Sequence, residues 1–128
     1  MMIKIKRAYD EASPDDGYRV LVERLWPRGV TKERAALDLW LKDVAPSTGL
    51  RKWFHKHPDD WQEFRERYWQ ELAGKKEDID LLERKAEEGT VTFIYSARDR
   101  EHNAATELKA YIELHVGPRE KRRIETAH

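Results

Sequence analysis

The sequence predicts one α/β domain, a small three-layer sandwich in which helices flank a mainly parallel central sheet. Short apolar segments typical of strands alternate with segments whose apolar residues recur at helical spacing, and this interleaving favours parallel strands joined by helices. The chain has 128 residues, enough for one hydrophobic core without disulfides or metals. We therefore expect a single domain over residues 1–117 and a loose basic tail over residues 118–128.

The N-terminal region is predicted to contain two strands. Residues 3–6 alternate apolar and charged side chains, a pattern typical of a strand with one face in solvent. A turn follows at residues 13–17, where proline, aspartate and glycine each favour a bend. Residues 18–23 are more apolar and predict a more buried strand. An irregular segment over residues 24–29 ends this strand, because proline follows Trp26 and disfavours helix there.

A short helix and a weak strand are predicted next. Thr31 is suited to cap a helix that runs through Leu37, because its hydroxyl can accept a hydrogen bond from a backbone N–H of the first turn. Residues 38–44 follow with a weak strand pattern. Ser47 or Thr48 is then suited to cap a longer helix.

The C-terminal half is predicted to contain three helices and the strongest strand. One helix is expected to start near Pro58, because proline suits the first helical position, and the next to end at Gly89. Residues 91–95 are apolar on both faces and therefore belong in the middle of the sheet. The last helix is expected over residues 103–116, with Gly117 and Pro118 ending it. The inward-facing residues of the first two helices are Trp61, Phe64, Tyr68, Leu72, Ile79, Leu82 and Ala86.

The composition excludes several classes of function. The 25 basic and 25 acidic residues cancel to a net charge of zero, which argues against a general DNA-coating protein that needs excess cations to displace counterions. The absence of cysteine excludes thiolate nucleophiles, disulfides and iron–sulfur clusters. No segment approaches the roughly 20 apolar residues of a membrane span, and the N-terminus lacks the apolar block of a signal peptide. We therefore expect a soluble cytoplasmic protein.

The polar residues suited to bind a ligand are predicted to lie at one edge of the sheet. In an open α/β sheet, ligands bind in the crevice beyond the carboxyl ends of the strands. This rule selects residues 24–29, after the second strand, and residues 96–103, after the central strand. The helix that begins at Ser47 or Thr48 is expected to supply a third wall, because a helix N-terminus favours an anion. Arg51 lies one turn into that helix.

Two arginines and a tryptophan are the ligand-binding candidates after the second strand. Arg24 and Arg28 flank a rigid Trp-Pro pair. Two guanidinium groups held in this way can grip a phosphate or carboxylate through paired hydrogen bonds. The alternative is that one of them forms a structural ion pair with Glu23, Asp38 or Asp99. Trp26 either stacks on a base or sugar or covers the end of the sheet.

Catalytic and metal-binding candidates are weak. Ser96 and His102 invite a nucleophile-and-base interpretation, but the sequence lacks a Gly-x-Ser-x-Gly motif and a serine closing a strand commonly forms a turn. Asp99 and His102 form either an acid–base or orienting pair or part of a solvated turn. His55 and His57 lack a third ligand at helical spacing on the same face. We therefore expect no metal and no cofactor.

The block Leu-Trp-Pro-Arg-Gly at residues 25–29 is highly specific. With several other blocks it closely resembles the YeaO-like proteins, a branch of domain-of-unknown-function family 488, and the resemblance covers residues 2 to about 115. It implies a small bacterial or archaeal cytoplasmic protein with a compact α/β fold. The other blocks lie at residues 6–10, 16–24, 37–42, 45–48, 50–54 and 95–99.

The resemblance also bears on catalysis. Other branches of the wider family look like cysteine-containing proteins, with one thiol just after the central strand and a second before a histidine. They have been suspected of acting on nucleic acid or in stress-related pathways. The matching positions here hold Ser96 and, nearby, His102 and Asn103. The thiol chemistry suspected of those relatives therefore cannot operate in this chain.

Three hypotheses about function follow. A cysteine-independent hydrolase or transferase would use Asp99 or His102. A non-enzymatic regulator or adaptor would use the aromatic helices between Trp53 and Trp69 as a partner surface. The leading hypothesis is a binding domain for an anionic ligand that resembles a nucleotide or, with weaker support from the basic tail, nucleic acid. Its crevice would be lined by Arg24, Trp26, Arg28, Ser47, Arg51, Ser96 and Asp99.

Overall fold

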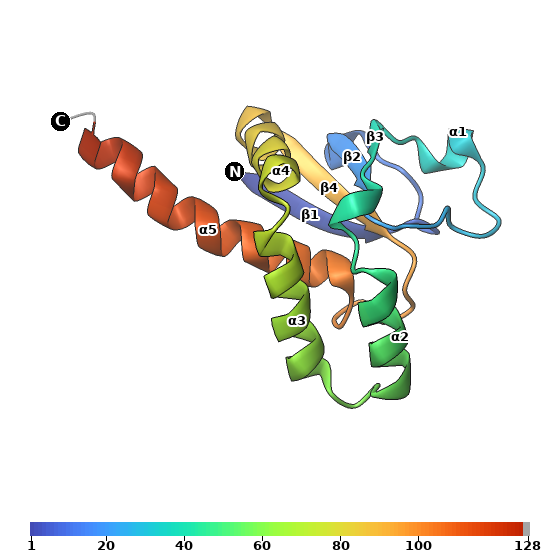
Figure 1. Ribbon diagram of the computed structural model, residues 1–128. Helices are drawn as coiled ribbons and strands as arrows, with labels where there is room; N and C mark the ends of the chain where they lie inside the picture. The colour runs from blue at the N-terminus through green and yellow to red at the C-terminus, as the bar shows by residue number, and fades with distance from the viewer. Residues whose placement is uncertain (127–128) are drawn as a thin grey trace.

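The computed structural model describes residues 1–126, with side chains described for residues 1–115. Its centre is a four-stranded sheet in which every pairing is parallel and the strand order is β1-β4-β2-β3 (Figure 1). This confirms the predicted α/β class and places the most apolar strand inside the sheet. The strands are β1 (Met2–Arg7), β2 (Tyr18–Leu21), β3 (Leu39–Trp40) and β4 (Thr90–Tyr95).

Helical segments separate each strand from the next along the chain. Parallel neighbours cannot be joined by a tight hairpin, so each connection must cross back over the sheet to the starting edge. The single-turn segments are η1 (Pro14–Asp16), η2 (Lys42–Val44) and the short α1 (Lys32–Ala35). The longer helices are α2 (Thr48–Lys56), α3 (Trp61–Ala73), α4 (Lys76–Glu88) and α5 (Ala104–Thr126).

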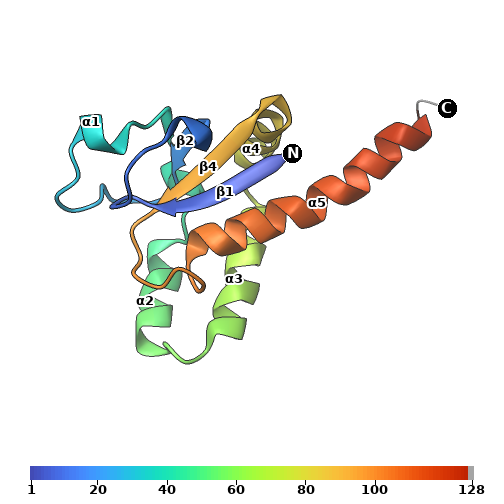
Figure 2. The same ribbon diagram turned by 180° about the vertical axis from the view of Figure 1, so that it is seen from behind.

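The two faces of the sheet have different coverings. On β4, Val91, Phe93 and Tyr95 point to one face and are buried in the larger core with residues of α3, α4 and α5. Ile94 points to the other face and packs with Leu21 and with the segment that contains α1. Figure 2 shows α1 and its loop beside β2, apart from α3, α4 and α5. Burial on both faces explains why β4 is apolar along its length.

The helix faces predicted from residue spacing are confirmed. Trp61 is half-buried against the larger core, next to the helix residues that are fully buried there. Helices whose apolar residues recur at this spacing bury one stripe and leave the rest of their surface in water. The buried residues predicted for α3 and α4 are Phe64, Tyr68, Leu72, Ile79, Leu82 and Ala86.

A buried cluster of charges joins η1 to the sheet. The Asp16 carboxylate accepts hydrogen bonds from Lys6 Nζ (2.9 and 3.1 Å) and from Arg19 Nη1. Arg19 also donates from Nε and Nη2 to the carbonyl of Ala35 (3.0 and 2.8 Å), and Thr92 Oγ1 donates to the carbonyl of Asp16 (2.7 Å). Asp16 and Arg19 are only 2% and 4% exposed. Pairing of this kind is what makes buried charges tolerable.

Some element boundaries differ from those predicted. The helix expected near Pro58 begins at Trp61, because residues 57–60 form a turn closed by the Asp60 N–H donating to the carbonyl of His57 (3.0 Å). Proline therefore lies in the turn rather than at the first helical position. This turn sets the angle between α2 and α3, which matters for the site described below.

Two of the predicted N-terminal elements are shorter in the structure. The helix capped by Thr31 ends at Ala35, because Ala36 takes a left-handed backbone conformation (φ 47°) and stops the helical repeat before Leu37. The weak strand pattern over residues 38–44 becomes the two-residue β3 followed by η2.

The last helix is longer than predicted. Gly117 and Pro118 do not end α5, which continues to Thr126. Relative to alanine, glycine and proline inside a helix cost about 1 and 3 kcal/mol. The other residues of a long helix can offset these costs. The basic side chains predicted for residues 118–128 lie outside the described side chains. Among the described residues, no helix is both long enough and apolar enough to span a membrane.

We predict that Asp16→Ala lowers the free energy of unfolding by about 3–5 kcal/mol, because Arg19 is left buried without its carboxylate. Urea unfolding followed by tryptophan fluorescence measures the change. The control is Asp15→Ala, which removes the exposed neighbouring carboxylate and is expected to change stability by less than about 0.5 kcal/mol. Equal effects of the two substitutions would contradict the structural role given to Asp16.

The same cluster predicts acid sensitivity. Desolvation raises the pKa of Asp16, but hydrogen bonds from Lys6, the Ser13 N–H and Arg19 outweigh it, so that the pKa lies below its usual value. A carboxyl with a lowered folded-state pKa stabilises the fold above its unfolded-state pKa, and this contribution is lost as the pH falls through the folded-state value. Below about pH 4, wild-type unfolding free energy should therefore fall more steeply than that of Asp16→Asn, as measured by urea unfolding across pH.

Candidate functional site

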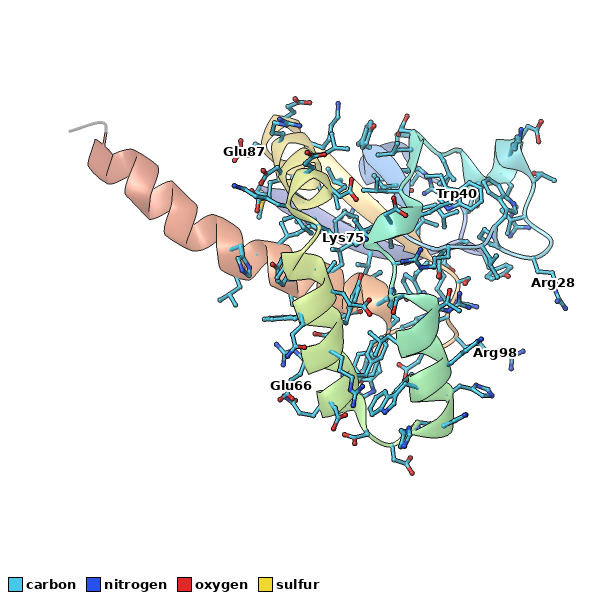
Figure 3. All side chains as sticks on the ribbon, in the orientation of Figure 1. Arg28, Trp40, Glu66, Lys75, Glu87 and Arg98 are labelled. Carbon is cyan, nitrogen blue, oxygen red and sulfur yellow. The ribbon has the colours of Figure 1, made fainter. Side chains whose placement is uncertain are left out.

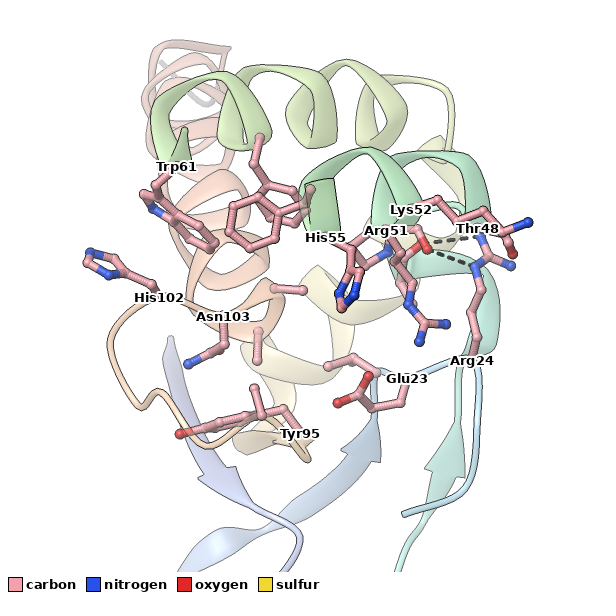
Figure 4. A pocket seen from close by; sticks show the side chains of 18 of the residues that line it. Glu23, Arg24, Thr48, Arg51, Lys52, His55, Trp61, Tyr95, His102 and Asn103 are labelled. Carbon is pink, nitrogen blue, oxygen red and sulfur yellow. Dashed lines mark hydrogen bonds between the residues drawn. The ribbon is translucent and has the colours of Figure 1, made fainter. Parts of the chain in front are cut away.

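A cavity of about 640 Å³ opens beyond the carboxyl ends of β2 and β4 (Figure 4). Its walls come from α2, from the first turn of α3, from the first turn of α5 and from the loop that leads into α5. The sequence predicts a crevice at this edge, and the structure has one there. The lining residues that carry polar or aromatic side chains are Glu23, Arg24, Thr48, Arg51, Lys52, Phe54, His55, Lys56, Trp61, Phe64, Tyr95, His102 and Asn103.

The path of the chain explains why a cavity forms here. β2 and β4 lie side by side in the sheet. After β2, the chain turns toward the face covered by α1, whereas after β4 it enters α5, which packs in the larger core on the opposite face. Neighbouring strands whose connections leave toward opposite faces leave a crevice between them, as at the switch point of other open α/β sheets.

One wall of the cavity is cationic. Thr48, Arg51, Lys52 and His55 recur at i, i+3, i+4 and i+7 along α2, so they share one side of the helix, and all four line the cavity. Figure 4 shows the Arg51 and His55 side chains extending from α2 toward the strand side. Arg24 lies at the end of this wall. Its Nε and Nη2 donate to the carbonyls of residues 46 and 45 (2.8 and 3.2 Å), so the guanidinium is fixed to the segment that precedes α2.

A second wall is aromatic. Phe54 of α2 packs against Trp61 and Phe64 of α3, with ring centroids 5.6 and 4.7 Å apart, and Trp61 stacks on Phe64 at 4.9 Å. The ring of His102 lies 5.1 Å from that of Trp61. The turn over residues 57–60 brings these rings together, because it folds α3 back beside α2.

Glu23 lies on the strand side of the cavity and is held by Ser96. Both the backbone N–H and the Oγ of Ser96 donate to Glu23 Oε1 (2.7 and 2.8 Å). The backbone carbonyl of Glu23 accepts from Trp40 Nε1 (2.6 Å). The hydroxyl of Ser96 is thus directed to a carboxylate, whereas His102 contacts Asp99, so the structure does not assemble the nucleophile-and-base pair considered from the sequence.

Asp99 shapes the loop at the mouth of the cavity without lining it. Its Oδ1 accepts from the N–H groups of Glu101 and His102 (both 2.9 Å), and its Oδ2 lies 3.5 Å from His102 Nδ1. These backbone hydrogen bonds hold the pKa of Asp99 below its usual value. Asp99 therefore orients His102, which does line the cavity.

Of the seven predicted ligand-binding residues, Arg24 and Arg51 line the cavity, whereas Ser96 and Asp99, described above, do not. Three more, Trp26, Arg28 and Ser47, are also absent from its lining. Trp26 donates from Nε1 to the carbonyl of Val30 (2.6 Å) and packs edge-on to Trp40 on the α1 side of the sheet. The Arg28 side chain is exposed on the same loop. Ser47 caps α2 by accepting from the Leu50 N–H (3.1 Å). The loop after β2 turns toward the α1 face, and this carries Trp26 and Arg28 away.

Ser47 is also bonded to α3. Its N–H and Oγ donate to the two carboxylate oxygens of Glu71 (2.8 and 2.6 Å). The pair joins the start of α2 to the end of α3 and so stabilises the frame of the cavity.

Several lining residues were not predicted from the sequence. Lys52 and Lys56 belong to the basic side of α2 together with Arg51, and the helical spacing of these residues was a usable signal. Glu23 comes two residues after the end of β2, so the expectation that ligands bind beyond the strand ends also pointed to it. Trp61 was assigned to the core, because spacing cannot distinguish a helix face that covers a core from one that borders a cavity.

His55, in α2, and His57, just after it, lie in different surroundings. His55 lines the cavity, whereas the His57 ring stacks on Trp53, with centroids 4.7 Å apart. Within the described residues there is no group of three or more His, Cys, Asp or Glu side chains placed to hold a metal ion.

We predict that Ser47→Ala lowers the free energy of unfolding by about 1 kcal/mol, because α2 loses its N-terminal cap and Glu71 loses a hydrogen bond. Ser47→Thr keeps the hydroxyl and is the matched control, expected to retain most of the stability. Urea unfolding of the two variants beside wild type makes the comparison. Wild-type stability in Ser47→Ala would show that the cap contributes nothing.

Comparisons with known proteins identify relatives along almost the whole chain. A family model described as the inactive DUF488-N3 subclade matches residues 2–126. The chain is 45% identical over 112 residues to the uncharacterized protein YeaO of Escherichia coli (strain K12), covering 88% of this chain and 97% of that protein. It is 47% identical over 70 residues to the uncharacterized protein Rv3073c of Mycobacterium tuberculosis (strain H37Rv), covering 55% and 59%. No solved structure gave a significant match. The chain therefore belongs to the inactive DUF488-N3 subclade.

Proposed function

We propose that this protein binds a small anionic ligand of the nucleotide class in the cavity at the carboxyl ends of β2 and β4, and that it binds this ligand without transforming it. The proposal rests on one observation, that a basic wall and an aromatic wall line the same cavity. Arg51, Lys52 and Lys56 supply positive charge from α2, and Phe54 and Trp61 supply flat apolar surface.

The two walls suit the two halves of a nucleotide. Guanidinium and ammonium groups bind phosphate through charge-assisted hydrogen bonds. Aromatic rings stack on the planar face of a base, as they do in many single-strand binding proteins. The volume of about 640 Å³ falls within the usual range of small-molecule sites, about 300–1,000 Å³.

Three observations support binding without catalysis. The matching family model is described as inactive. The chain has no cysteine to act as a nucleophile. The hydroxyl of Ser96 donates to Glu23 rather than to a histidine. The loop that carries Asp99 and His102 thus serves to shape the mouth of the cavity.

A single nucleotide fits the observations better than a nucleic acid chain. The protein has no net charge, whereas nucleic acid binding depends on an excess of cations along an extended surface. Four of its basic residues, Arg24, Arg51, Lys52 and Lys56, line one concave site instead.

The first experiment is a thermal-shift and calorimetry panel of adenosine, guanosine, cytidine and uridine phosphates, ribose 5-phosphate, inorganic phosphate and a short single-stranded oligonucleotide. A ligand at about 100 times its Kd stabilises the folded state by about 2.7 kcal/mol, which raises the Tm measurably. At least one mononucleotide is expected to do so. If none of the panel binds, the proposal is wrong; a response to the oligonucleotide alone would favour nucleic acid.

We predict that Arg51→Gln weakens mononucleotide binding by about 10-fold or more, because a charge-assisted hydrogen bond contributes about 1.5–3 kcal/mol. Arg84→Gln is the matched control, since Arg84 is an exposed arginine of α4 outside the cavity. Isothermal titration calorimetry at fixed ionic strength measures both affinities. Equal affinities of Arg51→Gln and Arg84→Gln would show that the basic side of α2 does not bind the nucleotide.

One observation favours a second candidate, an acid–base hydrolase or transferase. His102 lines the cavity, and its Nδ1 lies 3.5 Å from Asp99 Oδ2, the arrangement of an oriented base. We predict no turnover of any bound nucleotide by wild type, assayed by phosphate release and by chromatography. Turnover that is abolished in both Asp99→Ala and His102→Gln would establish the enzyme instead.

A further inference from the structure

Glu23 is the one carboxylate among the described lining residues of an otherwise cationic cavity. A carboxylate repels a bound phosphate, so Glu23 is suited to a different part of the ligand. Figure 4 shows the Glu23 side chain on the strand side of the cavity, across from Arg51 and His55 and away from Trp61.

The structure holds this carboxylate in one orientation. The two hydrogen bonds from Ser96 both go to Oε1, at 2.7 and 2.8 Å. Within the described part of the chain, no hydrogen bond or ion pair engages Oε2. The carbonyl of Glu23 is fixed by the indole of Trp40 (2.6 Å), which anchors the backbone as well. One oxygen is thus used for positioning, and the other remains available to an incoming hydrogen-bond donor.

We propose that Glu23 accepts hydrogen bonds from the hydroxyl groups of a sugar, so that the ligand is a hydroxylated organic phosphate, either a ribonucleotide or a sugar phosphate. This inference rests on the proposed function and names the ligand more closely. A carboxylate accepts short, charge-assisted hydrogen bonds from O–H donors. Acidic residues beyond strand ends bind ribose hydroxyls in dinucleotide-binding sheets by the same chemistry.

The three surfaces of the cavity then match three parts of one molecule. The basic side of α2, with Arg51 and Lys52, holds the phosphate. The Phe54 and Trp61 rings take a base, if the ligand carries one. Glu23 lies on the side formed by the strand ends, across from Arg51 and away from Trp61 (Figure 4), where the hydroxyl groups of the ligand's sugar would lie. Ser96 acts as a positioning residue, because it touches the carboxylate rather than the ligand.

The test compares ligands that differ only in their hydroxyl groups. Calorimetry of the wild-type protein with adenosine 5′-monophosphate and with its 2′,3′-dideoxy analogue is expected to give at least a tenfold difference in Kd. Ribose 5-phosphate and inorganic phosphate complete the set. Ribose 5-phosphate that binds as tightly as the nucleotide would identify a sugar phosphate; binding at least tenfold weaker would identify a ribonucleotide.

Variants test whether Glu23 is responsible for the difference in Kd between the nucleotide and its dideoxy analogue. Glu23→Gln keeps the shape and an acceptor for Ser96, and it is expected to reduce the tenfold ratio to less than threefold while inorganic phosphate binds as well as before or more tightly. Ser96→Ala is expected to reduce the ratio in the same direction. Glu33→Gln, an exposed glutamate of α1, is the control and should keep the wild-type ratio.

The outcomes separate this inference from the proposed function. Equal affinity of wild type for the nucleotide and its dideoxy analogue overturns the role of Glu23 but leaves anion binding intact. An unchanged ratio in folded Glu23→Gln overturns it as well. Absence of binding by every phosphate overturns the proposed function itself. If Glu23→Gln fails to fold, the wild-type ratio together with that of Ser96→Ala decides.

Discussion

The site depends on one constraint: β2 and β4 are parallel neighbours whose chains leave the sheet toward opposite faces. A parallel sheet brings all its carboxyl ends to one edge, so the residues that follow the strands meet there. Because the two exits diverge, they cannot fill the space between them. The α2 and α3 pair closes that space from one side, and the cavity takes its basic and aromatic walls from these two helices (Figure 3 gives the described side chains on the ribbon).

Two carboxylates near the sheet, one buried and one half-buried, differ in how many of their oxygens have hydrogen-bond partners. Asp16 has both oxygens engaged by Lys6, Arg19 and the Ser13 N–H, and it connects η1 to the strands. Glu23 has one oxygen engaged by Ser96. A fully paired buried carboxylate contributes to the fold, because its desolvation is offset by its partners. A carboxylate with one oxygen left open toward a cavity has capacity to bind something else.

Much of the fold and part of the site were predictable from local pattern. Alternation over residues 3–6 and the apolar run over residues 91–95 sufficed for a strand with one face in solvent and a central strand, because strand periodicity reports directly which faces are buried. The expectation that ligands bind beyond the strand ends located the cavity and its residues Arg24 and His102, and the expected helix N-terminus supplied Arg51. Trp26 was misplaced for a tertiary reason: its loop folds onto the α1 face, where the indole finds the Val30 carbonyl.

The sequence by itself determined the class of the fold, the helix faces and the absence of thiol chemistry, since these follow from residue periodicity and composition. The tertiary structure alone decided which polar residues share the cavity. Local pattern places a residue on an element, but the angle between elements decides what it faces. The turn at residues 57–60 turned Trp61 toward Phe54, and the exit of β2 turned Trp26 away. Glu23 met Ser96 only because parallel pairing aligned the ends of β2 and β4.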